Sequence, residues 1–314
     1  MSKSTLLCIV GPTACHKTEV SILLAKAMDG EIISADSVQV YTGMDIGSAK
    51  PTERERMGIP HHMIDCVPID TPSFSVVQYR SMAAQAIEGV ISRGKRPIVV
   101  GGSGLYVQAL TSPLEFAIPS DPVMRAYWNS VYEASPEDAV EQLAKCDPPT
   151  AQRLHLNDKK RIVRALEVYA CSGKPLSAYG NDFNGTSTAT ALYPSAILGL
   201  KIERAALVCR IHQRVDEMMR QGLLDEVERL WNVGYPRTLP AMQSIGYKQL
   251  FSYLDGDCTL EMAVAQIKQD TSRFAKRQMT WFRRDERIQW IDVTAFNNDK
   301  LSEIEQTAKE MLQE

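Results

Sequence analysis

The segment Gly11–Thr18 (GPTACHKT) constrains the fold of this chain more than any other feature. It follows a short apolar run, Thr5–Val10, that is typical of a buried strand, and it precedes Glu19–Met28, where apolar residues recur at helical spacing. A strand, a turn of this composition and a helix together form the phosphate-binding motif G-x-x-x-x-G-K-[ST]. Its backbone N–H groups and helix N-terminus favour an anion. The sequence therefore predicts an α/β protein with a phosphate site in this loop.

The loop departs from the motif at one position, because His16 stands where the second glycine belongs. Glycine keeps a Cβ away from the anion, whereas an imidazole either hinders the approach of a phosphate or donates an additional hydrogen bond to it. Lys17 supplies a positive charge, and the Thr18 hydroxyl is a candidate Mg²⁺ ligand. The alternative is a chance match in a strand-to-helix turn, but the flanking strand and helix are the context that the motif requires. We expect phosphate binding and leave the effect of His16 on affinity open.

Further apolar runs indicate more strands of the same kind. Glu31–Ala35, Pro97–Val100 and Ala196–Ile202 are expected to be strands, and Ile288–Ile291 is a candidate fifth one. Strands that alternate with helices form a parallel sheet covered by helices on both faces. The expected core is thus an α/β fold of the phosphate-loop type.

The pattern changes between Asp121 and Pro194. Helices are expected over 122–146 and 158–172, separated by Asp147-Pro148-Pro149, and Asn181–Thr190 has the composition of a loop. Because a core-type strand resumes afterwards, residues 121–194 are expected to be a mainly helical insertion. The core then comprises residues 1–120 and 195–314, and its C-terminal part is mainly helical.

Composition excludes several classes of protein. The apolar runs among the 314 residues are too short to cross a bilayer, so no membrane association is expected. The seven cysteines contain no Cys-x-x-Cys pair, which argues against a zinc ribbon and favours a reduced, cytoplasmic protein. The adjacent His61 and His62 lack a completing ligand pattern and are expected to be structural.

Polar residues follow two of the predicted strands. Asp36 comes directly after the second strand, and Ser103 lies in the glycine-rich turn after the third. In a parallel sheet these strand ends face the same crevice as the phosphate loop. Asp36 is a candidate general base or metal ligand, but an aspartate there is equally well explained as a cap of the following turn.

Seven segments in order resemble one family. They are Gly11–Thr18, Ser34–Tyr41 (SADSVQVY), Asp45–Pro51 (DIGSAKP), Pro60–Asp65 (PHHMID), Val100–Tyr106 (VGGSGLY), Arg161–Tyr169 (RIVRALEVY) and Ala275–Phe282 (AKRQMTWF). The chain resembles the tRNA dimethylallyltransferases, also called isopentenyl-tRNA transferases. The matches extend from about residue 5 to residue 290.

The resemblance implies an activity. The family transfers a dimethylallyl group from dimethylallyl diphosphate to N6 of the adenosine immediately 3′ of the anticodon, releasing diphosphate. It implies that Asp36 is the general base, that Arg214 assists the leaving group, and that Ser103, where the family usually has threonine, contacts the reacting nucleotide. Mg²⁺ would be bound at Thr18. The diphosphate would be held by Gly11, Pro12, Thr13, Ala14, Cys15, His16, Lys17 and Thr18.

The resemblance also implies contacts with the anticodon stem-loop of tRNA. Basic residues cluster in the insertion and near the C-terminus, interleaved with aromatic residues, which suits phosphate contacts and base stacking. Trp281 and Phe282 are as readily core residues, so the charges are the stronger candidates. The expected tRNA-binding residues are Asp36, Ser37, Val38, Gln39, Ser103, Arg125, Lys160, Arg161, Ile162, Val163, Arg164, Lys276 and Arg277. The protein is expected to act as a monomer.

Two alternatives remain at this stage. An ATP-dependent kinase shares the phosphate loop, the strand-end aspartate and the α/β core, but it does not explain the basic insertion or Ala275–Phe282. A tRNA-binding protein whose catalysis is impaired by His16 would bind tRNA in a salt-dependent manner without transferring a group.

Overall fold

The computed structural model describes residues 5–114, 118–179 and 191–313. It divides into two compact units, one of Met1–Thr111 with Leu192–Glu314 and the other of Ser112–Ala191. The insertion was expected to span residues 121–194. The loop expected at Asn181–Thr190 lies outside the described residues.

The first unit contains a six-stranded sheet in which every pairing is parallel, in the order β3-β2-β4-β1-β5-β6. This confirms the predicted α/β class. Strand β3 was not expected from the sequence, because its two residues are too few to show a pattern. The strands are β1 Leu6–Val10, β2 Gly30–Ser34, β3 His61–His62, β4 Arg96–Gly101, β5 Ser195–Lys201 and β6 Ile288–Asp292.

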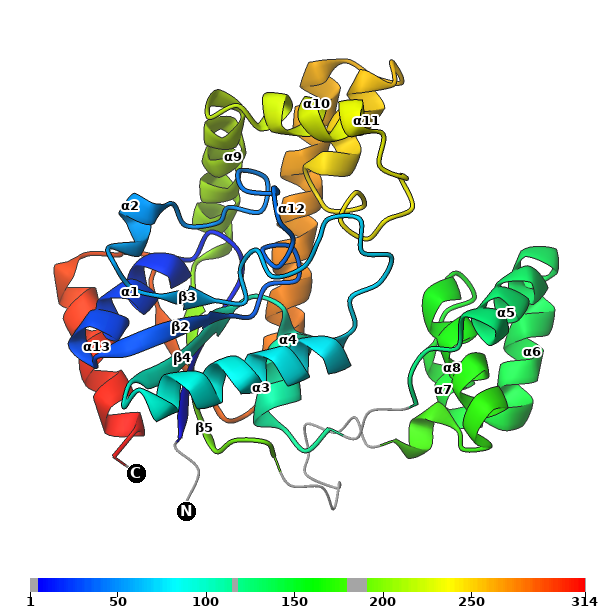
Figure 1. Ribbon diagram of the computed structural model, residues 1–314, viewed down its shortest axis with the longest axis horizontal. Helices are drawn as coiled ribbons and strands as arrows, with labels where there is room; N and C mark the ends of the chain where they lie inside the picture. The colour runs from blue at the N-terminus through cyan, green and yellow to red at the C-terminus, as the bar shows by residue number, and fades with distance from the viewer. Residues whose placement is uncertain (1–4, 115–117, 180–190, 314) are drawn as a thin grey trace. The chain divides into compact units, whose positions relative to one another are not determined.

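The alternation of side chains along β1 assigns the helices to the two faces of the sheet. Leu6, Cys8 and Val10 pack in one core with α3 (Val76–Ser92) and α4 (Gly104–Thr111). Leu7 and Ile9 point the other way, into a core with α1 (Lys17–Ala27) and α13 (Asn298–Met311). Figure 1 shows α1 and α13 on one side of the strands and α3 with α4 on the other. Since both faces of β1 are covered, its residues form a continuous apolar run rather than an alternating one.

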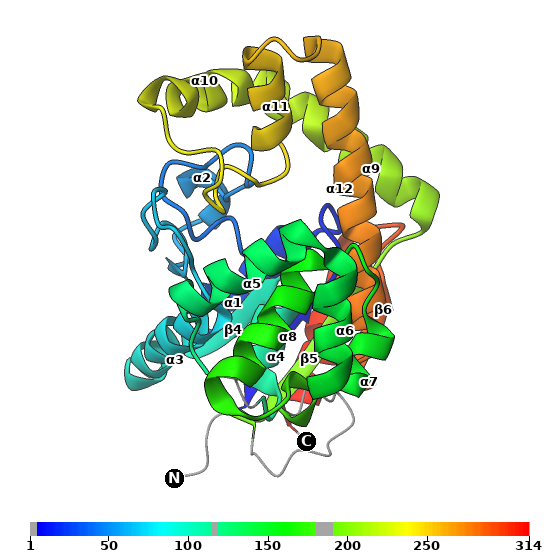
Figure 2. The same cartoon turned by 90° about the vertical axis from the view of Figure 1, so that its right-hand side faces the viewer.

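The C-terminal part of the first unit is helical, as predicted. Figure 2 shows α9 and α12 rising side by side from the sheet, with α10 and α11 near their far ends. A separate apolar core joins these helices to the chain between Val40 and Ile69. The helices are α9 Arg204–Arg220, α10 Leu223–Val233, α11 Tyr247–Leu254 and α12 Leu260–Phe282. Trp281 and Phe282 at the end of α12 pack in the sheet core.

The histidine pair lies at the edge of the sheet, paired with β2. His61 and His62 form β3, and the Nε2 atom of His62 lies 2.6 Å from Oε2 of the buried Glu31. The short helix α2, Glu53–Arg56, follows Thr52, whose side chain accepts from the backbone N–H of Glu55.

The second unit is a helical module with its own core. Asp147-Pro148-Pro149, expected to separate two helices, instead begins a short helix of its own. Asp147 accepts a hydrogen bond from Thr150 N at 3.2 Å, and proline suits the first helical position because its missing N–H has no partner to lose. The helices are α5 Pro122–Ala134, α6 Pro136–Cys146, α7 Pro148–Arg153, α8 Lys159–Ser172 and the short 3₁₀ turn η1 Leu176–Ala178.

All seven cysteines are free thiols. None of the helices over the described ranges is both long enough and apolar enough to cross a membrane.

Candidate active site

The ends of β2 and β4 are joined by hydrogen bonds beyond the sheet. Ala35 N donates to Val100 O at 2.7 Å, and Ser103 N donates to Ala35 O at 3.1 Å. The Ser103 hydroxyl accepts from Ser37 N at 3.0 Å. These bonds place Asp36 and Ser103 at the same edge of the sheet, next to the loop that follows β1. The convergence expected for parallel strands is present.

The loop after β1 has the conformation of an anion nest. Ala14 and His16 adopt left-handed φ values of 63° and 64°, and such alternation points successive N–H groups to one side. The Lys17 ammonium lies over the loop and donates to Pro12 O at 2.6 Å and to Gly11 O at 3.1 Å. Burial lowers the pKa of Lys17, because a desolvated cation is disfavoured. A phosphate anion bound here would supply the missing counter-charge.

The His16 side chain packs against the neighbouring structure. Its ring stacks on Phe296, with centroids 3.8 Å apart and planes at 20°. Its Nδ1 atom lies 3.1 Å from the Glu19 carboxylate and 3.4 Å from the guanidinium of Arg210, which also donates to Ala14 O. Burial is the main cause that lowers the pKa of His16, although Glu19 opposes the shift. The His16 imidazole is thus held by contacts that lie outside the nest of backbone N–H groups.

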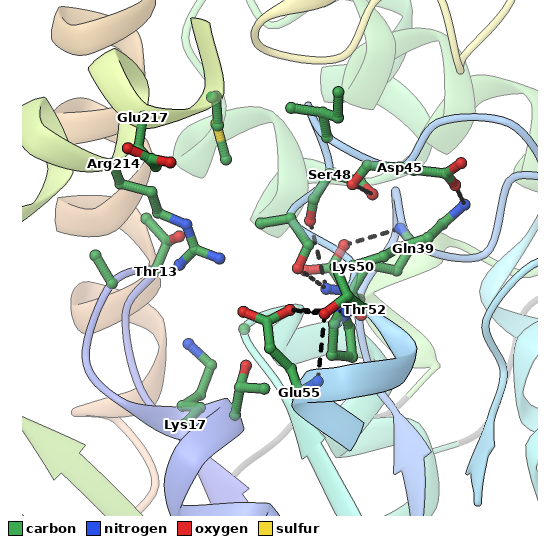
Figure 3. A pocket seen from close by; sticks show the side chains of 18 of the residues that line it. Thr13, Lys17, Gln39, Asp45, Ser48, Lys50, Thr52, Glu55, Arg214 and Glu217 are labelled. Atoms are coloured by element: carbon green, nitrogen blue, oxygen red, sulfur yellow. Dashed lines mark hydrogen bonds and ion pairs between the residues drawn. The ribbon is translucent and has the colours of Figure 1, made fainter. Parts of the chain in front are cut away.

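A cavity of about 810 Å³ lies over the phosphate loop. In Figure 3, Lys17 and Arg214 extend into this space from one side, while Glu55 approaches from the other. Arg214 comes from α9, and its guanidinium has no hydrogen-bond or ion-pair partner among the described residues. Burial lowers its pKa, while the nearby Asp36 carboxylate acts in the opposite direction. Lys17 and Arg214 thus bring two positive charges to one cavity. This favours a ligand that carries several negative charges.

Asp36 caps the turn after β2 and also faces the cavity. Its Oδ1 atom accepts from Val38 N at 2.8 Å and from Gln39 N at 3.3 Å, which stabilises the turn after β2. Its Oδ2 atom has no hydrogen-bond partner within the described part of the chain. The carboxylate lines the cavity, so one oxygen fixes the orientation of the group and the other remains able to accept a proton.

Gln278 joins two parts of the site and was not expected from the sequence. This buried amide of α12 accepts from Thr13 N at 2.9 Å and donates to Gly102 O at 3.0 Å, so it connects the phosphate loop to the turn after β4. A Cβ at residue 102 would lie 2.1 Å from Nε2 of Gln278, which explains the glycine there. Its only signal in the sequence was its position within Ala275–Phe282.

A second cavity of about 300 Å³ adjoins the first. Asp36, Arg214 and Thr13 line both, so the second cavity opens beside the carboxylate and the phosphate loop. Its other walls are largely apolar or small side chains, among them Val38, Ile211, Val215, Met218, Leu223, Pro240, Ile245, Ile267 and Phe274. This arrangement suits a short hydrocarbon group attached to a phosphorylated head.

The expected tRNA-contacting residues of the first unit differ in availability. Ser37 is exposed, and Lys276 and Arg277 are exposed on α12. Val38 is partly buried and lines the second cavity. The Gln39 amide is engaged internally, donating to Ser48 O and Ala49 O and accepting from Ser34 Oγ at 2.9 Å.

In the second unit, two of the expected arginines are paired. Arg125 and Arg164 lie 2.7 Å and 3.0 Å from the fully buried carboxylate of Glu167. Burial alone would raise the pKa of Glu167, but the hydrogen bonds from these arginines outweigh it and lower the pKa. Ile162 and Val163 are buried in the core of the unit. Lys160 and Arg161 are exposed, so their side chains are accessible to a ligand, and Arg161 pairs with Asp158 at 3.4 Å.

The residues around the phosphate loop fit a magnesium ion held mainly by substrate. The described residues contain no group of three or more His, Cys, Asp and Glu side chains arranged to hold a metal. Mg²⁺ usually takes one or two protein ligands and completes its shell with phosphate oxygens and water. The exposed Thr18 hydroxyl at the start of α1 lines the large cavity and would provide such a ligand.

Comparison with known proteins identifies the family. Residues 39–285 match the family model described as IPP transferase. The chain belongs to this family. A relative from Geotalea daltonii, named tRNA dimethylallyltransferase 2, is 47% identical over 294 residues, covering 93% of this chain and 89% of that protein.

Solved structures agree with the assignment. The crystal structure of the full-length tRNA isopentenylpyrophosphate transferase from Bacillus halodurans is 39% identical, with a TM-score of 0.72 over 99% of this chain and 97% of that one. A structure of a eukaryotic dimethylallyltransferase acting on tRNA is 28% identical, with a TM-score of 0.80 over 94% of this chain and 75% of that one. The fold of this family member is therefore shared along nearly its whole length.

Proposed function

We propose that this family member transfers a dimethylallyl group from dimethylallyl diphosphate to N6 of the adenosine immediately 3′ of the anticodon in tRNA. The names of the similar proteins support this reaction. One structural observation carries the proposal for this chain. A carboxylate with a free oxygen, on Asp36, lies between a phosphate nest and an apolar cavity.

Asp36 would act as the general base. The lone pair of the exocyclic adenine amine is delocalised into the ring, so the amine is a poor nucleophile until a proton is removed. Nitrogen N6 attacks C1 of the allylic group, the N–C bond forms and the C–O bond to the diphosphate breaks. The proton passes from N6 to Oδ2 of Asp36. The products are the N6-substituted adenosine and diphosphate.

Cationic groups would stabilise the leaving group. The N–H nest at Ala14–Lys17, the Lys17 ammonium and the Arg214 guanidinium face the position where negative charge develops. When bound at Thr18, Mg²⁺ would neutralise part of the charge on the diphosphate oxygens. The apolar cavity would take the five-carbon chain and keep water away from the allylic carbon.

The tRNA would be held by exposed basic side chains of both units. Lys276 and Arg277 on α12 and Lys160 and Arg161 on α8 are the exposed candidates for phosphate contacts. The target adenine must leave its stack to reach a carboxylate that lines a cavity, as in other enzymes that act on bases.

The direct test measures transfer of labelled dimethylallyl diphosphate to unmodified tRNA in the presence of Mg²⁺. We expect label in tRNA for the wild type and a rate lower by about 10²- to 10⁴-fold for Asp36→Asn, the range typical of a general base. Asp70→Asn, which changes an exposed aspartate that lines neither cavity, is the matched control and should keep the wild-type rate. An unchanged rate in Asp36→Asn would refute the assignment of the base.

The same assay separates the two alternatives. Label that appears with wild type and also with His16→Gly would show that the histidine is tolerated. Label with His16→Gly alone would favour the impaired tRNA-binding protein. Turnover of ATP without tRNA, and no transfer by either protein, would favour the kinase.

A further inference from the structure

The loop between Asp45 and Lys50 forms one wall of the apolar cavity. Gly47, Ser48 and Ala49 line the cavity opposite residues of α9 and close to the base Asp36. The position of this loop therefore sets the width of the apolar cavity. What holds the loop is a group far away in the sequence.

The Glu226 carboxylate, near the N-terminus of α10, accepts four hydrogen bonds. Its Oε2 accepts from Asp45 N and Ile46 N, both at 2.9 Å, and its Oε1 accepts from Gly47 N at 3.1 Å and from the Tyr247 hydroxyl at 2.6 Å. Glu226 is 2% exposed and Tyr247 is fully buried. Three consecutive backbone N–H groups of the loop thus depend on one buried carboxylate.

Tyr247 contacts the same loop directly. A Cβ at residue 47 would lie 2.6 Å from Cε2 of the Tyr247 ring, so glycine is needed for this approach. Burial and the adjacent Glu226 charge raise the pKa of the Tyr247 hydroxyl, which keeps it protonated as a donor. The Tyr247 ring and the Glu226 carboxylate together fix the position of Gly47 relative to α11.

The other end of the loop is held independently. The buried Lys50 ammonium donates to Tyr41 O at 2.7 Å and pairs with Asp45 at 2.8 Å and Asp65 at 2.5 Å. Loss of the contacts at Glu226 would therefore release the middle of the loop while its ends stay attached. The cavity wall, rather than the whole site, would move.

We propose that Glu226, supported by Tyr247, is a positioning residue that fixes this wall and thereby limits the allylic chain of the donor to five carbons. The inference rests on the proposed function, since it concerns the same cavity and the same donor. Glu226 does not line the cavity itself and acts through Gly47–Ala49. A carboxylate is required, because an amide would present a donor to backbone donors.

The test measures the affinity of three ligands by calorimetry with Mg²⁺ present. They are dimethylallyl diphosphate, geranyl diphosphate, which has twice as many carbons in its chain, and inorganic diphosphate. The proteins are the wild type, Glu226→Gln, Tyr247→Phe and the control Glu228→Gln. Glu228 lies on the same helix and makes no hydrogen bond or ion pair to a described residue. Thermal unfolding of each protein shows whether it is folded at the temperature used.

We expect Glu226→Gln to bind dimethylallyl diphosphate at least fivefold more weakly and to lose at least fivefold of the wild-type preference for it over geranyl diphosphate. Inorganic diphosphate should bind within twofold of the wild type, because the phosphate loop is untouched. Tyr247→Phe, which keeps the three backbone contacts, should shift the same preference in the same direction by less. The control should match the wild type.

An unchanged preference in Glu226→Gln and Tyr247→Phe would overturn the inference. Equal weakening of all three ligands would also overturn it, because the effect would then lie at the phosphate loop. If Glu226→Gln does not fold, Tyr247→Phe alone decides by the same criteria. Failure of the proposed function is seen separately, as absence of transfer to tRNA by the wild type.

Discussion

The conformation of His16 makes a prediction about stability that two substitutions can test. His16 has φ 64° and ψ 14°, and a residue with a Cβ in this region costs about 1 to 2 kcal/mol. The wild-type chain has this cost too, but its ring stacks on Phe296 at a centroid distance of 3.8 Å. Such a stack contributes about 0.5 to 1.5 kcal/mol beyond the burial of the ring.

The two effects separate in His16→Gly and His16→Ala. Both variants lose the stack, but only alanine retains the cost of the left-handed conformation. Glycine also increases the conformational entropy of the unfolded chain, which lowers the stability of His16→Gly by about 0.4 to 1 kcal/mol. We therefore expect the order of stability wild type, His16→Gly, His16→Ala, with the two variants about 1 kcal/mol apart.

Urea unfolding at pH 8 measures these differences. Because the insertion has its own core and contains Trp128, the transition of the first unit is followed by tryptophan fluorescence in a Trp128→Phe background, in which the remaining tryptophans Trp231, Trp281 and Trp290 all belong to that unit. Equal stability of the two variants would refute the argument from backbone conformation. A His16→Gly variant more stable than the wild type would refute the contribution of the ring. In a Phe296→Ala background, the loss on His16→Ala should shrink by the stacking energy.

Four further predictions follow from the site. Burial lowers the pKa of His16, so below about pH 6.5 the unfolded chain binds a proton more readily than the folded one. Stability of the wild type should therefore fall as the pH drops from 7 to 5, and fall less in His16→Gly, as urea titrations at each pH would show. Gln278→Ala should raise the KM for dimethylallyl diphosphate about tenfold and leave the KM for tRNA within twofold, because Thr13 N loses its hydrogen-bond acceptor. Equal changes in both constants would contradict this prediction. Removal of Mg²⁺ with EDTA should abolish transfer, and Thr18→Ala but not Thr18→Ser should raise the Mg²⁺ concentration needed for half-maximal rate. Arg125→Ala should destabilise the insertion by about 1 to 3 kcal/mol in thermal unfolding, because it leaves the buried Glu167 carboxylate with one partner fewer. Arg161→Ala should leave the stability unchanged and weaken tRNA binding in filter assays.

Local pattern and parallel topology were sufficient to predict the frame of the site. The apolar run before Gly11 and the helical spacing after Thr18 identified the phosphate loop. Because parallel strands end at one edge of the sheet, the sequence also predicted that Asp36 and Ser103 lie next to that loop. These inferences need only neighbours in the sequence and a general rule about sheets.

The residues that hold the site together could not be predicted in this way. Gln278 bonds to Thr13 across 265 positions, and Glu226 bonds to Asp45 across 181. Neither the type of these two residues nor their spacing from other residues distinguishes them from ordinary residues of a helix. Their partners are backbone groups whose positions exist only in the folded chain.

Charge alone did not show which basic residues are paired within the fold. Arg125 and Arg164 were expected to contact tRNA, and both pair with the buried Glu167. Ile162 and Val163 share a motif with exposed basic residues but face the core of the insertion. The helical period separates the two groups once the buried face is known.

The central claim is that this chain forms an N–C bond at N6 of one adenosine and that Asp36 accepts the proton. The most direct measurement is nuclease digestion and mass spectrometry of unmodified tRNA after incubation with dimethylallyl diphosphate and Mg²⁺. We predict one dimethylallyl group on the nucleoside immediately 3′ of the anticodon with the wild type, and on the same time scale almost none with Asp36→Asn. An unmodified tRNA with the wild type, or equal modification by Asp36→Asn, would contradict the account.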